Sequence, residues 1–120
     1  MFALLEHDTT PPGVAAGSQT VHWDLLVEAP GRARVPTWRL AHNPLDHAGP
    51  VPAARIQDHR PLYLDFEGAI SGGRGRVRRL ERGPAEVERL AGAELLVHLA
   101  GPRLCGRYEI ACGADGVLRF

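Results

Sequence analysis

The sequence contains no lysine, so all 14 of its basic residues are arginine. They are balanced by 14 acidic residues, and the formal net charge is zero. A net charge of zero excludes a general electrostatic attraction to nucleic acid or to an anionic membrane. The arginines still matter individually, because each carries a planar guanidinium that can bind a phosphate or a carboxylate through two parallel hydrogen bonds. Each of the 14 basic residues is therefore suited individually to bind a phosphate or a carboxylate.

Cysteines and long apolar runs are also scarce. The two cysteines are Cys105 and Cys112, and their odd separation would place them on opposite faces of a continuous strand, which disfavours a disulfide between them. No apolar run approaches the ~20 residues needed to cross a bilayer, and the N-terminus lacks a signal-like apolar segment. We therefore expect a cytoplasmic protein in a reducing compartment, with no membrane partner.

Short extended segments separated by turn residues dominate the chain. With 120 residues, of which 44% are hydrophobic, it is long enough to form one domain, 1–120, with its own core. The expected strands are approximately 2–6, 21–28, 35–41, 55–67, 76–81 and 103–111. Residues 42–54 are expected to be irregular, and 84–100 fits either a helix or strands. The pattern predicts an all-β fold, a compact closed or nearly closed β-barrel with at most one short helix.

One expected strand carries two potential metal ligands. Side chains alternate along a strand, so His22, Asp24 and Glu28 share one face, while the opposite face of the same segment is wholly apolar. An imidazole and a carboxylate two positions apart can bind one divalent cation, and His7 is available as a third ligand. Two imidazoles and a carboxylate would leave coordination positions open for water and substrate. The alternative is a solvated, hydrogen-bonded His–Asp pair on an exposed strand face.

A second pair of reactive side chains follows within residues 58–68. His59 and Tyr63 lie four positions apart around Pro61. If the chain bends at Arg60-Pro61, both side chains can face one cavity. There, His59 could donate a hydrogen bond to a phosphate oxygen or a leaving group, and Tyr63 could bind the same anion. On local sequence alone, the simpler interpretation places Tyr63 in the core and His59 in a turn.

An arginine-rich segment offers a candidate nucleic-acid surface. Arg74, Arg76 and Arg78 would share one strand face and form a cationic stripe suited to a nucleic-acid backbone. A solvated edge strand that discourages aggregation explains the same pattern equally well. The glycine-rich turn before this segment lacks the lysine and the spacing of a P-loop, so a nucleotide cradle is not indicated.

Several short motifs occur in an order that resembles a known family. They are His7-Asp8, His22–Glu28, Thr37-Trp38, Asp58–Gly68 and Gly106-Arg107-Tyr108. Together they resemble the 3′-phosphoesterase domain of bacterial DNA ligase D and, more closely, the small stand-alone proteins related to that domain. The resemblance extends from Leu4 to about Ile110.

The resemblance implies a β-barrel with a Mn²⁺-dependent activity on DNA 3′ ends, although nitrogen and oxygen ligands also suit Zn²⁺. Such an activity removes a 3′-terminal ribonucleotide or a 3′-phosphate and leaves a 3′-hydroxyl. By motif, the metal ligands fall on His7, His22 and Asp24, and the histidine and tyrosine near the phosphate fall on His59 and Tyr63. The expected partners are a DNA or RNA 3′ end and a ligase or polymerase of end repair.

The chain departs from the family pattern in its anion-binding residues. Leu26 stands where the family has an arginine that holds the phosphate, and His42 stands where it has a lysine. The stretch between the first two ligands is longer and lacks the paired arginines of the family. Losing one bidentate arginine could remove roughly 2–5 kcal/mol from an interaction with a desolvated anion. The candidates to replace it are Arg39, Arg74 and Arg76.

Three functions therefore remain open on sequence grounds. The first is a metal-dependent phosphoesterase that trims nucleic-acid 3′ ends. The second is a catalytically weakened metal-binding barrel that recognises nucleic-acid ends without turnover, a hypothesis motivated by Leu26. The third is a small-molecule metalloenzyme of cupin-like architecture, although cupins typically carry His-X-His on a strand.

Overall fold

The computed structural model describes residues 1–10, 20–47, 49–70, 75–111 and 117–119. Apart from one short 3₁₀ helix, η1 (Pro61–Leu64), every regular element in these residues is a β-strand. The strands are β1 (Phe2–Asp8), β2 (Val21–Val27), β3 (Val35–Leu40), β4 (Val51–His59), β5 (Gly68–Ala69), β6 (Arg76–Gly83), β7 (Ala85–Ala91), β8 (Glu94–Ala100), β9 (Cys105–Ala111) and β10 (Val117–Arg119).

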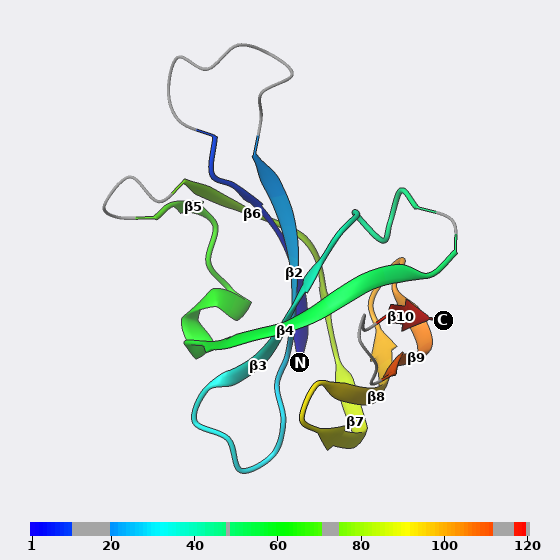
Figure 1. Ribbon diagram of the computed structural model, residues 1–120. Helices are drawn as coiled ribbons and strands as arrows, with labels where there is room; N and C mark the ends of the chain where they lie inside the picture. The colour runs from blue at the N-terminus through cyan, green and yellow to red at the C-terminus, as the bar shows by residue number, and fades with distance from the viewer. Residues whose placement is uncertain (11–19, 48, 71–74, 112–116, 120) are drawn as a thin grey trace.

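The strands form two antiparallel sheets that are joined through β4. They follow the order β5-β6-β1-β2-β3-β4-β10-β9-β8-β7. Most of β4, from Ala53 to His59, pairs with β3, whereas Val51 and Pro52 at its start pair with β10. Figure 1 shows β4 as a long strand that crosses from the first group of strands to the second. The first sheet therefore runs from β5 to β4, and the second from β10 to β7.

The main hydrophobic core lies between the two sheets. Among its buried residues are Phe2, Leu4, Leu25, Trp38, Leu95 and Val97. Trp38 is fully buried, and its indole Nε1 donates a hydrogen bond to the carbonyl oxygen of Ala93 at 2.9 Å. Because Ala93 lies in the turn between β7 and β8, this bond ties the second sheet to β3 of the first.

A smaller hydrophobic cluster covers the opposite face of the first sheet. It consists of Ala3, Leu5, Leu26, Val35, Leu64 and Val77, with Tyr63, Phe66 and Ile70 packed against it. Because side chains alternate along a strand, Leu5 and Leu26 point away from the main core. Leu64 of η1 belongs to the same cluster and is buried. The face on which the sequence places the potential ligands is therefore partly covered by the segment that follows β4.

The all-β prediction is confirmed, and the described residues contain no helix beyond the short η1. The closed barrel, however, is wrong for this part of the chain, because β5 and β7 stand at the two ends of the strand order and do not pair with each other. Alternation predicts strands without specifying their partners. The ends are protected differently, since β5 has two residues and β7 carries Glu86, Glu88 and Arg89.

Two expected segments have different boundaries in the structure. Residues 51–54, expected to be irregular, form the start of β4, which ends at His59 because Pro61 begins the 3₁₀ helix. The ambiguous segment 84–100 is a β7–β8 hairpin. Its turn contains Gly92 at a φ of 60°, in the left-handed region that glycine adopts without steric penalty.

The structure bears only in part on the expectations about membranes and about disulfides. The described residues include no helix with the length and apolar character needed to cross a membrane. Cys105 is exposed, and Cys112 lies outside the described residues. The absence of a disulfide and the cytoplasmic compartment therefore stay predictions.

Candidate metal centre and adjoining pocket

Two histidine rings face each other across the pairing of β1 with β2. His7 and His22 are directly opposite in the register and are both partly buried. The Nδ1 atom of His7 lies 3.0 Å from the Nε2 atom of His22, and the ring centroids are 4.7 Å apart in an edge-to-face contact. The alternation of apolar and polar residues fixes the register of these strands. That register brings together two ring nitrogens that are 15 positions apart in sequence.

Asp24 adds a buried carboxylate to this pair. Its side chain is 3% exposed, and its Oδ2 atom lies 3.6 Å from His22 Nε2. One ligand atom from each of His7, His22 and Asp24 lies within 4.8 Å of the other two. Two atoms bound about 2.1 Å from one ion are separated by roughly 3.0–3.4 Å at angles between roughly 90° and 109°. The 3.0 Å between the His7 and His22 nitrogens and the 3.6 Å between His22 Nε2 and Asp24 Oδ2 are close to this range, and the donor set suits Mn²⁺, Fe²⁺ or Zn²⁺.

Burial and neighbouring charges hold two of these ligands in the protonation states that bind metal. Burial, reinforced by the charge of Arg39, lowers the pKa of His22 despite the nearby Asp24 carboxylate. Burial by itself would raise the pKa of Asp24, but its interactions with His59 and His22 outweigh burial and lower this pKa. A neutral imidazole and an ionised carboxylate are the forms that coordinate a metal.

His59 approaches the same carboxylate from the end of β4. Its Nε2 atom lies 3.6 Å from Asp24 Oδ2, and its Nδ1 atom donates to the Gln57 carbonyl oxygen at 3.0 Å. Because both ring nitrogens face acceptors, the protonated imidazolium is favoured. The pairing with Asp24 raises the pKa of His59, against the effect of burial and with help from the Gln57 carbonyl. His59 is therefore suited to keep a proton at Nε2 beside the candidate ligands.

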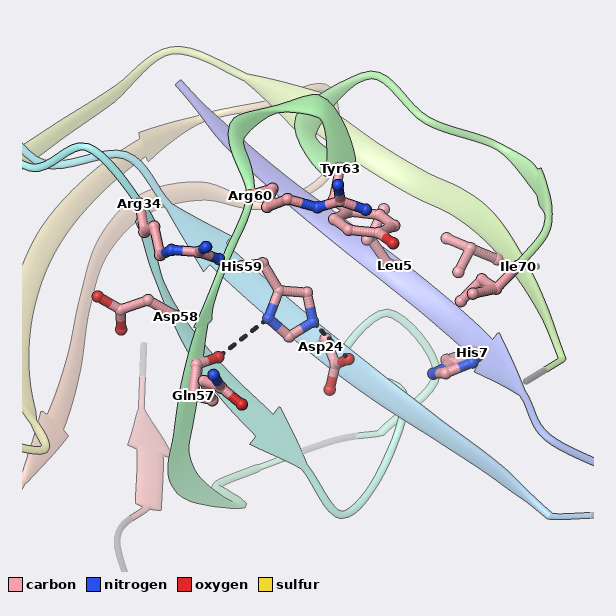
Figure 2. Close-up of a pocket in the computed structure, with 11 residues that line it drawn as sticks. Leu5, His7, Asp24, Arg34, Gln57, Asp58, His59, Arg60, Tyr63 and Ile70 are labelled. Atoms are coloured by element: carbon pink, nitrogen blue, oxygen red, sulfur yellow. Dashed lines mark hydrogen bonds and ion pairs between the residues drawn. The ribbon is translucent and has the colours of Figure 1, made fainter. Parts of the chain in front are cut away.

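A pocket of about 440 Å³ adjoins these residues. Its lining includes His7, Asp24, His59, Tyr63, Arg34 and Arg60. The ring of Tyr63, which η1 carries, packs edge to face against His59 with centroids 5.7 Å apart. Figure 2 shows the His59 ring between the Asp24 carboxylate and the Tyr63 ring. The bend at Arg60-Pro61 thus brings the two predicted catalytic residues into the same pocket as two of the predicted metal ligands.

The three arginines predicted to bind phosphate lie in different places. Arg39 is opposite Asp24 in the register, with its Nε atom 3.5 Å from Asp24 Oδ1 and about half of its side chain exposed. It belongs to the site, but it is paired with a candidate ligand. Arg76 lines a different pocket, together with Glu6. Arg74 lies outside the described residues.

Leu26 is fully buried in the smaller hydrophobic cluster. It shares a strand face with Asp24, yet Leu64 and the rest of that cluster pack around it. The position that carries an arginine in the resembled family is therefore part of an apolar floor in this chain.

Sequence reasoning missed two arginines that line the pocket, Arg34 and Arg60. Arg34 belongs to none of the motifs, and Arg60 lies within the Asp58–Gly68 motif but was not singled out as an anion ligand. Their proximity depends on the pairing of Val35 with His59 across β3 and β4, which local sequence does not reveal. The available signal was the Arg60-Pro61 dipeptide, because a residue before proline is held extended and marks a bend in the chain.

No protein-family model matches the chain, and no curated protein matches it either. The candidate function therefore rests on the geometry of the site and on the motif resemblance described above.

Proposed function

We propose that this chain is a metal-dependent phosphoesterase that trims nucleic-acid 3′ ends by removing a 3′-phosphate or a 3′-terminal ribonucleotide. The observation that carries the proposal is the grouping of His7, His22 and Asp24, with ligand atoms within 4.8 Å of one another, beside a pocket that also contains His59 and Tyr63. Metal-dependent phosphoester hydrolysis uses a Lewis acid, a proton donor for the leaving oxygen and groups that bind the anion.

Each requirement has a candidate among these side chains. A divalent metal held by His7, His22 and Asp24 would polarise a phosphoryl oxygen and acidify a water molecule. His59 can supply a proton from Nε2 to the leaving oxygen. Its ring is held in place on two sides, by the Gln57 carbonyl at Nδ1 and by the Asp24 carboxylate at Nε2. Tyr63 packs against the same ring and offers a hydroxyl for a phosphate oxygen.

The substrate class, the metal and the partners in this proposal come from the motif resemblance. It favours Mn²⁺, a DNA or RNA 3′ end, and a ligase or polymerase that uses the 3′-hydroxyl product, all in the cytoplasm. The formal net charge is zero, so the attraction to a nucleic-acid end must come from local groups rather than from the overall field of the protein.

One observation favours a second candidate function, a metal-binding protein that recognises nucleic-acid ends without turnover. Leu26 is fully buried among apolar residues, so no arginine holds the phosphate from that position. A site with weaker transition-state binding can still bind the ground state. The two candidates therefore differ in turnover rather than in the choice of ligand.

The test is an end-processing assay with the full chain. Two primer-templates, one with a 3′-phosphate and one with a single 3′-terminal ribonucleotide, are incubated with Mn²⁺, Mg²⁺, Zn²⁺ or a chelator. The proposal expects metal-dependent formation of a 3′-hydroxyl end. His22→Ala should abolish it, and His98→Ala, which changes an exposed histidine of the second sheet, should leave it unchanged.

The two candidate functions give opposite results in this assay. Product that requires metal and disappears only in His22→Ala supports the phosphoesterase. Absence of product with every metal, combined with metal-dependent binding of the same substrates, rejects turnover and supports the recognition function.

A further inference from the structure

Arg34 and Arg60 line the pocket from the two positions that flank paired strand ends, just before β3 and just after β4. Val35, the first residue of β3, is paired with His59, the last residue of β4. In an antiparallel pair, the residue before one partner lies beside the residue after the other. Arg34 and Arg60 occupy these two positions, and both line the pocket.

Both positions are anchored by buried or constrained neighbours. Val35 is 2% exposed, so the backbone that carries Arg34 is fixed at one end. Arg60 has an extended backbone, with φ −68° and ψ 146°, immediately before Pro61. Its guanidinium lies 5.7 Å from the centre of the Tyr63 ring, and Figure 2 shows it above that ring. The backbone of both residues is therefore fixed beside the pocket, and both residues are exposed to incoming anions.

Neither arginine has a carboxylate within ion-pair distance in the part of the chain that the structure describes. The two carboxylates that line the pocket are already paired with other cations. Asp58 binds Arg55 at 2.7 Å, and Asp24 has Arg39, His22 and His59 within 3.6 Å. The positive charges of Arg34 and Arg60 are therefore not neutralised by a nearby carboxylate. Two such arginines at one pocket are suited to bind an anion.

We propose that Arg34 and Arg60 form the phosphate-binding subsite of this pocket, holding the phosphate of a nucleic-acid 3′ end next to the candidate metal ligands. This subsite takes over the role expected for Arg39, Arg74 or Arg76. It deepens the proposed function and rests on it for the identity of the substrate. The claim that these two residues bind phosphate stands separately, on their position and their lack of carboxylate partners.

The subsite also accounts for the loss of an arginine at Leu26. An arginine at position 26 would approach the phosphate from the face of β2 that also carries Asp24. In this chain that route is filled by apolar side chains around Leu26 and Leu64. Arg34 and Arg60 line the pocket instead from the end of the β3–β4 pair.

The experiment measures binding without turnover. The probes are a 3′-phosphorylated oligonucleotide, the same oligonucleotide with a 3′-hydroxyl, and inorganic phosphate as a competitor, all titrated into the metal-loaded protein on ice. Wild-type protein is expected to prefer the 3′-phosphorylated form. Arg34→Gln and Arg60→Gln should each weaken binding of that form by about 10-fold to 100-fold, the range for a lost hydrogen bond to a charged group, with little effect on the 3′-hydroxyl form.

A matched control removes one arginine elsewhere. Arg89→Gln changes an exposed residue of the edge strand β7 and alters the net charge by the same amount. It should leave the preference for the 3′-phosphate intact. Metal content, measured on all the purified variants, should equal that of wild type, because neither Arg34 nor Arg60 belongs to the ligand group.

The possible results separate this proposal from the proposed function. If Arg34→Gln and Arg60→Gln bind the 3′-phosphorylated oligonucleotide as wild type does, the subsite is wrong even where the wild-type protein turns substrate over. If wild type shows no turnover but both variants lose the 3′-phosphate preference, the subsite stands and the catalytic proposal fails. If inorganic phosphate displaces the 3′-phosphorylated oligonucleotide from wild type and not from the variants, Arg34 and Arg60 bind the phosphate group itself.

Discussion

His7 and His22 face each other across two antiparallel strands, with the Nδ1 atom of one 3.0 Å from the Nε2 atom of the other. With neutral rings, one of these nitrogens donates a proton to the other. A metal ion would replace that single proton with a bond to each nitrogen. The contact is therefore one in which metal and protons compete for the same atoms.

The first prediction follows from this competition. Binding of Mn²⁺ or Zn²⁺ should raise the Tm of the protein, because the metal binds the folded state and not the unfolded one. His7→Ala, His22→Ala and Asp24→Asn should each abolish the shift. The affinity should fall at acid pH, because protons compete with the metal for the ligand atoms. Since burial lowers the pKa of His22, this ligand should become protonated only below the ordinary pKa range of histidine. Thermal denaturation with and without metal at several pH values checks this, and a shift that persists in His22→Ala would assign the metal to other residues.

The second prediction separates His59 from the metal ligands. His59→Gln should reduce turnover by roughly 10²-fold to 10⁴-fold, the range for a lost general acid. Metal content should be retained, because the ligand group comprises His7, His22 and Asp24. Steady-state kinetics and metal analysis of the same preparation test both halves. Loss of metal together with activity would show that His59 acts as a ligand rather than as a proton donor.

The sequence predicted the local arrangement of the site better than its surroundings. Alternation along residues 21–28 predicted that His22 and Asp24 lie on one face of the strand and the apolar residues on the other. In the structure, Leu25 and Val27 lie in the main core, and His22 and Asp24 lie together on the opposite face. The approach of His7 followed from the end of the preceding strand. These features depend on neighbouring residues and on a single strand pairing, which a sequence can specify.

The features that sequence reasoning missed depend on contacts between distant segments. The pairing of β4 with both β3 and β10 joins the two sheets, and β5 and β7 at the ends of the strand order do not pair with each other. Alternation of residues does not specify either of these partner choices. Likewise, the sequence shows Leu26 as the loss of an arginine, whereas the structure places it in one apolar cluster with Leu64, 38 positions later. Arg34 and Arg60 line the same pocket because Val35 pairs with His59.

The third prediction concerns a buried carboxylate away from the site. Glu81 of β6 is 6% exposed, and its Oε2 atom accepts hydrogen bonds from the backbone N–H groups of Arg103 and Leu104, the latter at 2.7 Å. Glu81→Ala leaves these donors unsatisfied and should lower the free energy of unfolding by about 2–4 kcal/mol. Glu81→Gln keeps an acceptor oxygen and should lower it by less. Urea denaturation of the three proteins measures both differences, and equal stability of Glu81→Ala and wild type would refute this role.

The last prediction uses Leu26 to test whether the anion subsite has moved. Leu26→Arg restores the residue type of the resembled family, but the side chain is fully buried in apolar surroundings. Burying an unpaired charge there should destabilise the fold by about 4 kcal/mol or more, without increasing turnover. Leu26→Met, which conserves volume and polarity, should reduce the free energy of unfolding by less than about 1.5 kcal/mol and keep the preference for a 3′-phosphate. A stable Leu26→Arg protein with faster turnover would place the phosphate on the β2 face, and Arg34 and Arg60 would then lose their assigned role.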